Sequence, residues 1–252
     1  MAKQYDAIHN RLFLLQIVLL GFLLAAYQFS GASAALSNGL TARFGEDLWY
    51  VSNAVYTLIS VFGFAAFMTP FSFYSGFVLE HYFELSNETL GDWLFDFIKS
   101  LCIDLLLATV LFSVIYALLR LMTEWWWLAA AVFYILFAVL ISTLAPVIIL
   151  PLFHKFEPLD DGELAEAVKK MMDDAGIKVI GIFKWGLQEK TRTANAAFTG
   201  FGRTKRIVLG DTLLTNYTQE EILAILAHEV GHYKNLDTFR LMFTSSVLAL
   251  AA

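Results

Sequence analysis

Charge is scarce in this chain. Only 16% of its 252 residues are charged and 58% are apolar or aromatic, whereas about 25% of the residues in a soluble domain are charged. The mean hydropathy is +0.63. This composition excludes an ordinary soluble enzyme, and it excludes a disordered chain, which needs few apolar residues and many charges. It is typical of an integral membrane protein.

Basic residues and cysteine are scarce as well. The chain has 17 lysines and arginines against 23 acidic residues, a net charge of −6. It therefore lacks the positive surface that binds nucleic acid, and we expect no nucleic-acid partner. The single cysteine, Cys102, lies in an apolar run and cannot close an intrachain disulfide.

The few charges leave long gaps, and each gap indicates a membrane span because a charge at the bilayer centre costs several kcal/mol. We expect Pro70 to end or kink the second span, Asp104 to lie near one end of the third, and Pro146 and Pro151 to close the fourth. The four predicted spans, each long enough for a transmembrane helix, are 12–29, 49–73, 101–119 and 125–149. A removed signal peptide is the alternative for the first, although its apolar run is long and three more spans follow.

The distribution of lysine and arginine predicts the orientation. With four spans, the N-terminus, the 76–99 loop and all residues after 155 share one side, and the other side carries only Arg43 and Arg120. The positive-inside rule places the richer side in the cytosol. We therefore expect a multi-pass protein of the plasma (inner) or ER membrane, surrounded by the lipid bilayer.

Composition changes at residue 154, and the following residues read as a folded, water-facing domain. Helices are predicted over 163–174 and 218–237, the second with a capping box formed by Thr218 and Glu221. A strand over 178–185 and a hairpin formed by 193–201 and 205–210 are expected between them. The predicted organisation is a membrane domain over 1–153, a cytosol-facing domain over 154–238 and the start of a fifth helix over 239–252.

The second of these helices contains the H-E-x-x-H motif His228-Glu229-Val230-Gly231-His232. Residues four apart lie one turn apart on one face of a helix, so both imidazoles can bind one zinc ion. Glu229 adjoins the first ligand and can accept a proton from a zinc-bound water as the general base. The motif therefore predicts a zinc cofactor and hydrolysis of a peptide bond. Two unrelated histidines on the surface of a helix are the alternative.

Catalytic zinc takes three protein ligands and a water, and the motif supplies two. The only carboxylate after Glu229 is Asp237, which we expect at the helix end or on the surface rather than on the metal. Residues 241–252 form an apolar run too short to span a bilayer. We therefore expect the chain to be truncated inside a fifth transmembrane helix and the third ligand to lie beyond its end. If the motif helix continues to Phe239, the metal lies about 10 Å from the apolar run, at the membrane surface.

Five sequence blocks support a more specific hypothesis. They are FVLEHYFELSNETLG (77–91), PLFHKFEPL (151–159), TANAAFTG (193–200), RIVLGDTLL (206–214) and HEVGHYK (228–234). In this order they resemble the CAAX prenyl protease 1 family of integral membrane zinc metallopeptidases. The resemblance implies a gluzincin-type endopeptidase with a helical barrel around an intramembrane chamber. It also implies zinc bound by His228, His232 and a glutamate on a later helix, with Glu229 as the general base.

The resemblance also assigns a role to Asn195, which matches the asparagine of the family's N-A-x-F segment. That segment adjoins the edge strand along which substrate lies, and an edge strand can pair with an extended peptide. A turn or strand-end residue is the alternative. Two departures are that the family often has a histidine where Asp237 stands, and that eukaryotic members have a further span near the N-terminus.

The predicted fold is therefore mainly α, a polytopic helical membrane protein with a small α+β zinc metallopeptidase domain. The predicted function is hydrolysis of peptide bonds in membrane-associated proteins, including CAAX-type substrates. Two alternatives are a quality-control protease of membrane proteins with the same chemistry, and a non-catalytic membrane scaffold or transport component. A carboxylate ligand after the motif distinguishes an enzyme from a scaffold. The sequence makes no prediction of the oligomeric state.

Overall fold

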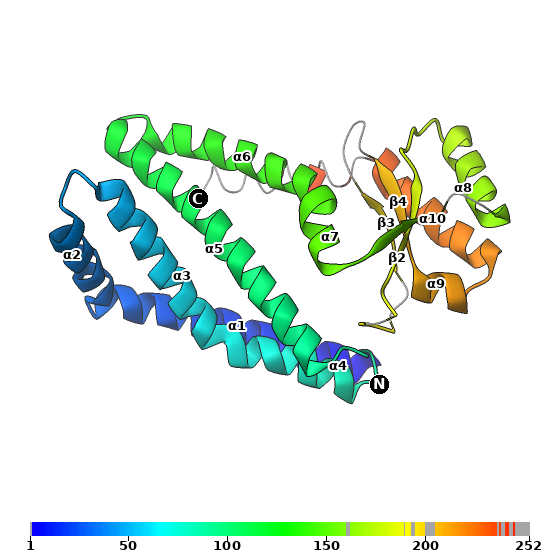
Figure 1. Ribbon diagram of the computed structural model, residues 1–252, viewed down its shortest axis with the longest axis horizontal. Coiled ribbons are helices and arrows are strands. Elements are labelled where there is room, and N and C mark those ends of the chain that lie inside the picture. The colour runs from blue at the N-terminus through cyan, green and yellow to red at the C-terminus, as the bar shows by residue number, and fades with distance from the viewer. Residues whose placement is uncertain are drawn as a thin grey trace. The chain divides into compact units, whose positions relative to one another are not determined.

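The computed structural model describes residues 2–159, 162–188, 190–192, 195–199, 205–235, 237, 240–241 and 244. The chain separates into two compact units, Met1–Val132 and Phe133–Ala252, whose helices and strands are labelled in Figure 1.

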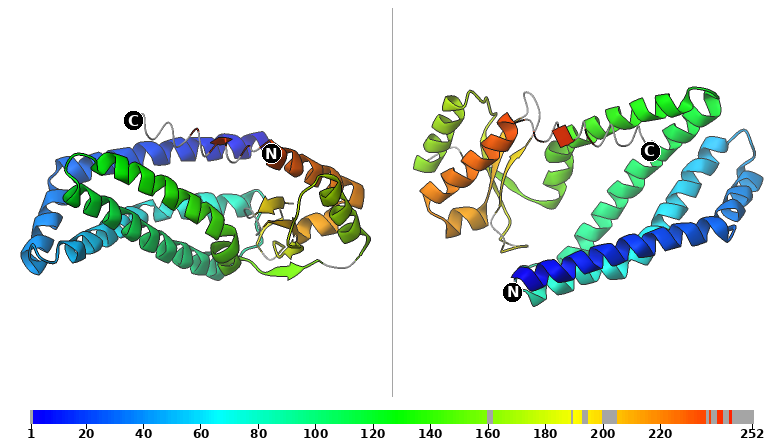
Figure 2. Two further views of the ribbon diagram at one scale, coloured as in Figure 1. Left: turned by 90° about the horizontal axis from the view of Figure 1, so that it is seen from above. Right: turned by 180° about the vertical axis from the view of Figure 1, so that it is seen from behind.

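The first unit is built from long helices. α3 packs against both α2 and α5, and α1 contacts α2 and α3. Figure 2 shows α2 standing between the end of α1 and the start of α3, so that these two helices spread apart at this end. The elements are α1 (Ala2–Phe29), α2 (Ala32–Phe44), α3 (Trp49–Phe73), the π-helix η1 (Tyr74–Val78), α4 (Leu79–Tyr82), α5 (Leu90–Leu121) and the beginning of α6 (Trp126–Leu144).

Four helical segments are long and apolar enough to cross a membrane. They are Lys3–Phe29, Trp49–Tyr82, Leu90–Leu121 and Trp126–Phe153, and each overlaps one of the spans that the charge gaps predict. Large apolar side chains on these segments are exposed, as expected of helices whose surroundings are lipid. The mainly α, polytopic helical fold is confirmed.

Pro70 does not end the second span and Pro146 does not end the fourth, whereas Pro151 lies in the last turn of the fourth, which ends at Phe153. Pro70 lies inside α3, and the N–H of Tyr74 points back to the carbonyls of Phe71 and Pro70 where the helix widens into η1. Pro146 lies in a second π-helix, η2 (Ala145–Ile149), which continues into α7 (Leu150–Phe153). Proline lacks an N–H and its ring crowds the preceding turn, and a wider π-helical turn accommodates that irregularity within a continuing helix.

The position of Asp104 also differs from the prediction. α5 begins at Leu90, where the Thr89 side chain accepts a hydrogen bond from the N–H of Asp92 at 3.2 Å. Asp104 therefore lies near the middle of α5 rather than near one end. The uninterrupted apolar run begins only at Leu101, because Asp96 and Lys99, which form an ion pair of 2.7 Å, lie before it within the same helix.

The second unit contains a four-stranded sheet in the order β1-β2-β4-β3. β1 and β2 are antiparallel, β2 and β4 are parallel, and β3 pairs with β4 as an antiparallel hairpin. The predicted hairpin is thus confirmed, although residues 200–204 of its turn lie outside the described residues. The predicted strand over 178–185 is shorter, since only its last four residues pair. The strands are β1 (Phe156–Pro158), β2 (Ile182–Trp185), β3 (Ala196–Thr199) and β4 (Arg206–Gly210).

Helices α8 (Glu163–Asp174), α9 (Asp211–Asn216) and α10 (Gln219–Lys234) gather beside this sheet (Figure 1). α8 has the predicted range, and Gly176, with φ +71°, follows it in the left-handed region that favours glycine. The core between the helices and the sheet is fully buried and includes Met172, Ile207 and Leu226. Burial of each such side chain stabilises the unit by about 1.5–3 kcal/mol. This core fixes α10 on the sheet.

Candidate active site

The helix that carries the histidine motif is fixed at its start and along one face. The Thr218 side chain accepts the N–H of Glu221 at 3.4 Å, and the Glu221 carboxylate accepts the N–H of Thr218 at 2.8 Å. The predicted capping box is therefore confirmed, and its hydrogen bonds lower the pKa of Glu221. Ile222, Leu226 and Val230 are buried one turn apart. With that face on the core, α10 presents the motif histidines on its exposed side.

His228 and His232 meet on this exposed side. Their Nε2 atoms lie 3.0 Å apart, and their ring centroids 4.5 Å apart. Two nitrogens bound to one tetrahedral zinc at 2.0–2.1 Å each would be separated by about 3.3 Å. The two Nε2 atoms are therefore close to the geometry of a chelating pair, which two unrelated surface histidines do not require.

Asp237 lies just beyond the end of α10 and contacts the motif. Its Oδ2 lies 2.7 Å from Nδ1 of His232, and the hydrogen bond and charge of Asp237 raise the pKa of that histidine. α10 ends at Lys234 instead of continuing to Phe239, with the N–H of Asn235 bonded to the carbonyl of Gly231. A carboxylate on the far nitrogen of a histidine fixes its tautomer and leaves the other nitrogen for a metal.

Glu229 follows His228 directly and is half-buried. Its negative charge adds to the effect of Asp237 in raising the pKa of His232. The structure thus brings three predicted site residues, His228, Glu229 and His232, together on one helix.

The edge strand β3 lies beside α10, and Asn195 immediately precedes it. The side chain of Asn195 is exposed, and its carbonyl accepts the N–H of Gly210 at 2.8 Å. A Cβ on Gly210 would lie 2.8 Å from Leu187 Cδ1 and 2.9 Å from the Asn195 carbonyl oxygen. The backbone at the start of β3 is thus held by a close approach that only glycine permits. Sequence reasoning missed this role of Gly210, although the glycine at the end of a predicted strand was a signal.

Two ligands are present where a metal site needs three. In the part of the chain that the structure describes, no group of three or more His, Cys, Asp or Glu side chains is arranged to hold a metal ion. The donor chemistry of the histidine pair nevertheless fits zinc. Of the expected fifth helix over 239–252, only Arg240, Leu241 and Thr244 are described, each in helical conformation, and the other residues lie outside the described part.

Comparison with known proteins identifies the family. Residues 2–155 match the family model described as CAAX prenyl protease N-terminal, five membrane helices, and residues 158–252 match peptidase family M48. The chain belongs to the CAAX prenyl protease 1 family. The resemblance noted in the five sequence blocks is thereby confirmed, and the chain is a multi-pass membrane protein.

Individual relatives agree with this assignment. CAAX prenyl protease 1 of Saccharomyces cerevisiae is 36% identical over 190 residues, which cover 72% of this chain and 41% of the relative. The uncharacterized metalloprotease YhfN of Bacillus subtilis is 31% identical over 238 residues, covering 92% of this chain and 54% of that protein. The crystal structure of S. mikatae Ste24p matches with a TM-score of 0.85 at 25% identity, covering 98% of this chain and 58% of that chain. The chain spans about half the length of the curated relatives it matches.

The number of spans can be compared with the family description. The N-terminal family model names five membrane helices, and the described part of residues 2–155 has four segments that are long and apolar enough to cross. α2, with 13 residues, is the remaining long helix. It is shorter than the roughly 20 residues of a transmembrane helix.

Proposed function

We propose that this protein is a zinc metalloendopeptidase of gluzincin type that hydrolyses peptide bonds of membrane-associated proteins, including prenylated CAAX-type substrates. The observation that carries this proposal is the close pair of His228 and His232, backed by Asp237 and placed beside an edge strand. Family membership supports the same chemistry, and the names of the CAAX prenyl proteases among its relatives suggest the substrate class.

The Nε2 atoms of His228 and His232 would hold the zinc ion. When bound, zinc lowers the pKa of its water to about 7 and polarises the carbonyl of the scissile bond. We assign the third ligand to a carboxylate outside the described residues, because these offer two ligands and Asp237 is engaged with His232.

The residues of this chain perform the remaining tasks. Glu229 accepts a proton from the attacking water and delivers it to the nitrogen of the leaving amine. Asp237 accepts a hydrogen bond from the Nδ1–H of His232, which leaves the lone pair of Nε2 available to bind the metal. The edge of β3, which has no strand partner among the described residues, binds the substrate as an added strand, and the exposed amide of Asn195 contacts it at the start of that strand.

Substrate access follows from the membrane setting. We assign the N-terminus and the second unit's sheet to the cytosolic side, because Lys and Arg favour that side in the short loops. Cleavage would then occur close to the cytosolic membrane surface, where a lipid-modified protein terminus is held by the bilayer.

A quality-control protease with the same chemistry is the second candidate. The bacterial relative named only as a metalloprotease aligns over 92% of this chain, against 72% for the yeast CAAX prenyl protease. A quality-control protease would also cleave substrates without a prenyl group, and this distinguishes it from a protease specific for CAAX-type substrates.

The test compares cleavage by wild-type chain and by Glu229→Gln, purified in detergent and supplied with zinc. A farnesylated CAAX peptide and the same peptide without the lipid are the substrates, and product masses identify the bond cut. We expect Glu229→Gln to lose at least about 100-fold in rate. Glu220→Gln, an exposed carboxylate in the first turn of the same helix, is the matched control and should retain the rate.

Three results would contradict parts of the proposal. Equal cleavage by wild type and Glu229→Gln would exclude Glu229 as the general base. Equal cleavage of both peptides would favour the quality-control function over the CAAX function. Absence of cleavage by a wild-type chain shown to hold one zinc ion would support the scaffold alternative for this chain.

A further inference from the structure

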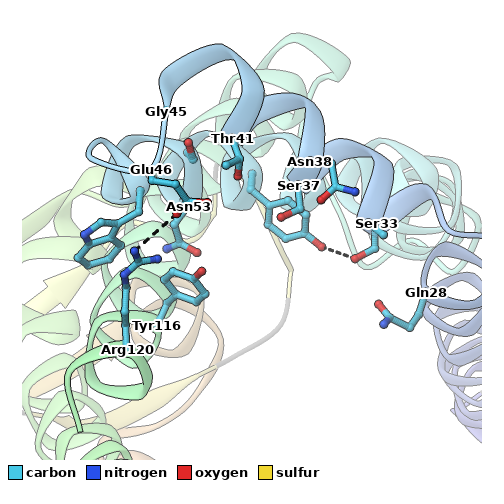
Figure 3. Close-up of a pocket in the computed structure, with 14 residues that line it drawn as sticks. Gln28, Ser33, Ser37, Asn38, Thr41, Gly45, Glu46, Asn53, Tyr116 and Arg120 are labelled. Atoms are coloured by element: carbon cyan, nitrogen blue, oxygen red, sulfur yellow. Dashed lines mark hydrogen bonds and ion pairs between the residues drawn. The ribbon is translucent and has the colours of Figure 1, made fainter. Parts of the chain in front are cut away.

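A polar pocket lies inside the first unit, where α2 separates the end of α1 from the start of α3 (Figure 3). Its volume is about 570 Å³, which is within the range of small-molecule sites. Hydroxyl, amide and charged side chains converge on it, among them Ser37, Asn38, Thr41, Glu46, Asn53 and Arg120. This composition is unusual in a unit whose helices are otherwise apolar.

The pocket lies at the ends of the membrane spans. Trp49 is the first residue of α3, and Arg120 is the last but one of α5. Tyr56, on the pocket wall, is seven residues further along α3, or about 10 Å from its start. Trp49 and Tyr116 are aromatic residues of the kind enriched at the membrane–water interface. The pocket therefore extends from the level of the lipid headgroups about 10 Å into the span.

Two opposite charges form one wall. Nη2 of Arg120 lies 3.6 Å from Oε2 of Glu46, and the dashed line in Figure 3 marks this pair. A charge-assisted hydrogen bond measures 2.7–2.9 Å, so the pair is loose, and its side chains are 41% and 76% exposed. An exposed ion pair contributes little to stability, so a ligand with both charges can replace it at little cost.

Neutral polar groups form the facing wall. The side chains of Ser37, Asn38 and Thr41 line the pocket from α2, and none has a hydrogen-bond partner within the described residues. Neighbouring polar groups instead hold the wall in place. The hydroxyls of Ser33 and Tyr56 are 2.8 Å apart, and Figure 3 shows this bond between α2 and α3. The Ser33–Tyr56 bond thus ties α2 to α3 at the pocket, and the side chains of Ser37, Asn38 and Thr41 are available to hydrogen-bond a ligand.

We propose that this pocket binds a phosphoethanolamine group, with its phosphate at Arg120, its ammonium at Glu46 and its remaining hydrogen bonds to the side chains of α2. The two charges of the wall sum to zero, which matches a zwitterion rather than an anion. Arg120 supplies the planar fork of donors that phosphate oxygens prefer. The depth of the pocket makes a phospholipid headgroup the source, and soluble glycerophosphoethanolamine shares its chemistry.

The aromatic residues favour a primary over a quaternary ammonium. A quaternary ammonium such as choline binds in a cage of open aromatic faces. Here the Arg120 guanidinium lies over the Trp49 ring at 5.4 Å, and the rings of Trp49 and Tyr116 pack at 5.8 Å. A primary ammonium needs hydrogen-bond acceptors instead, and the carboxylate of Glu46 and the hydroxyls of α2 supply them.

Lipid retention by the purified chain tests the proposal. The protein in detergent is incubated with phosphatidylethanolamine, phosphatidylcholine and phosphatidylglycerol of identical acyl chains, and native mass spectrometry counts the bound lipids. We expect preferential retention of phosphatidylethanolamine. Arg120→Gln and Glu46→Gln should each weaken it about tenfold. Arg43→Gln, an exposed arginine in the last turn of α2 that does not line the pocket, should leave it unchanged.

The contrary outcomes are distinct. Equal retention of the three lipids, or a preference for phosphatidylglycerol, overturns the zwitterion site. A preference that survives both Arg120→Gln and Glu46→Gln overturns the location. Because the Glu46 side chain is largely exposed, Glu46→Gln should keep the fold, which helix content by circular dichroism checks. If an equal concentration of glycerophosphoethanolamine displaces the bound phosphatidylethanolamine, the ligand is the soluble compound. If only a large excess displaces it, the ligand is the lipid.

Discussion

The carboxylate of Asp237 determines which nitrogen of His232 is available to a metal. Because Asp237 binds Nδ1 at 2.7 Å, the protonated imidazole is favoured and its pKa is raised above its ordinary value of 6.5. The folded-state pKa therefore exceeds the unfolded one. The stabilisation is complete below the unfolded pKa and is lost as pH rises through the folded pKa.

We expect Asp237→Asn to lower the pKa of His232 towards 6.5 in the metal-free chain. The reason is that the amide cannot replace the negative charge of the carboxylate. Histidine NMR resonances followed against pH measure this shift. Asp174→Asn, at the exposed end of α8, should leave it unchanged. Zinc competes with the proton, so binding should strengthen as pH rises through the pKa of His232.

The same substitution should weaken zinc binding about 10-fold to 100-fold, since the carboxylate orients the ligand. A chelator competition assay measures this change. Zinc affinity and a His232 pKa that are both insensitive to Asp237→Asn would show that the contact has no functional role.

At the scale of the element, the close approach of Gly210 to Asn195 fixes where the edge strand begins. In Gly210→Ala, the new Cβ would lie under 3.0 Å from both Leu187 Cδ1 and the Asn195 carbonyl oxygen. We expect a destabilisation of about 1–3 kcal/mol and weaker peptide binding along β3, which thermal unfolding and peptide titration measure. Gly231→Ala meets nothing within 4 Å and is the control for stability. An unchanged melting temperature in Gly210→Ala would contradict this account.

Elements with a local cause were predictable from the sequence. Charge gaps located the four spans, and the Thr218–Glu221 box located the start of α10. Local patterns were insufficient where the structure depends on a contact with a residue distant in the sequence or on a less common helix geometry. The helices continue past Pro70 and Pro146 through π-helical turns. The sequence did not predict this, because a proline in the sequence does not specify whether the helix ends or widens at that turn.

The candidate site was predictable only in part for the same reason. The spacing of His228 and His232 is a property of one helix and follows from its periodicity. Asp237 lies beyond the end of α10 at Lys234, so the periodicity of that helix does not predict its contact with His232. The roles of Gly210 and Asn195 depend on the pairing of β3 with β4, and the order of these segments in the sequence does not specify that contact.

At the scale of the whole molecule, the shortage of ligands is the decisive feature. The chain spans about half the length of its curated relatives, and the described residues offer the zinc ion two histidines. A site with two protein ligands holds zinc more weakly than one with three. We therefore expect less than one zinc per purified chain after dialysis in detergent, and background zinc in His228→Ala, measured by elemental analysis. One zinc per wild-type chain, lost in His228→Ala, would show that the site is complete in the purified protein and would overturn the expectation of a weak, two-ligand site. Equal zinc in both proteins would overturn the histidine site itself.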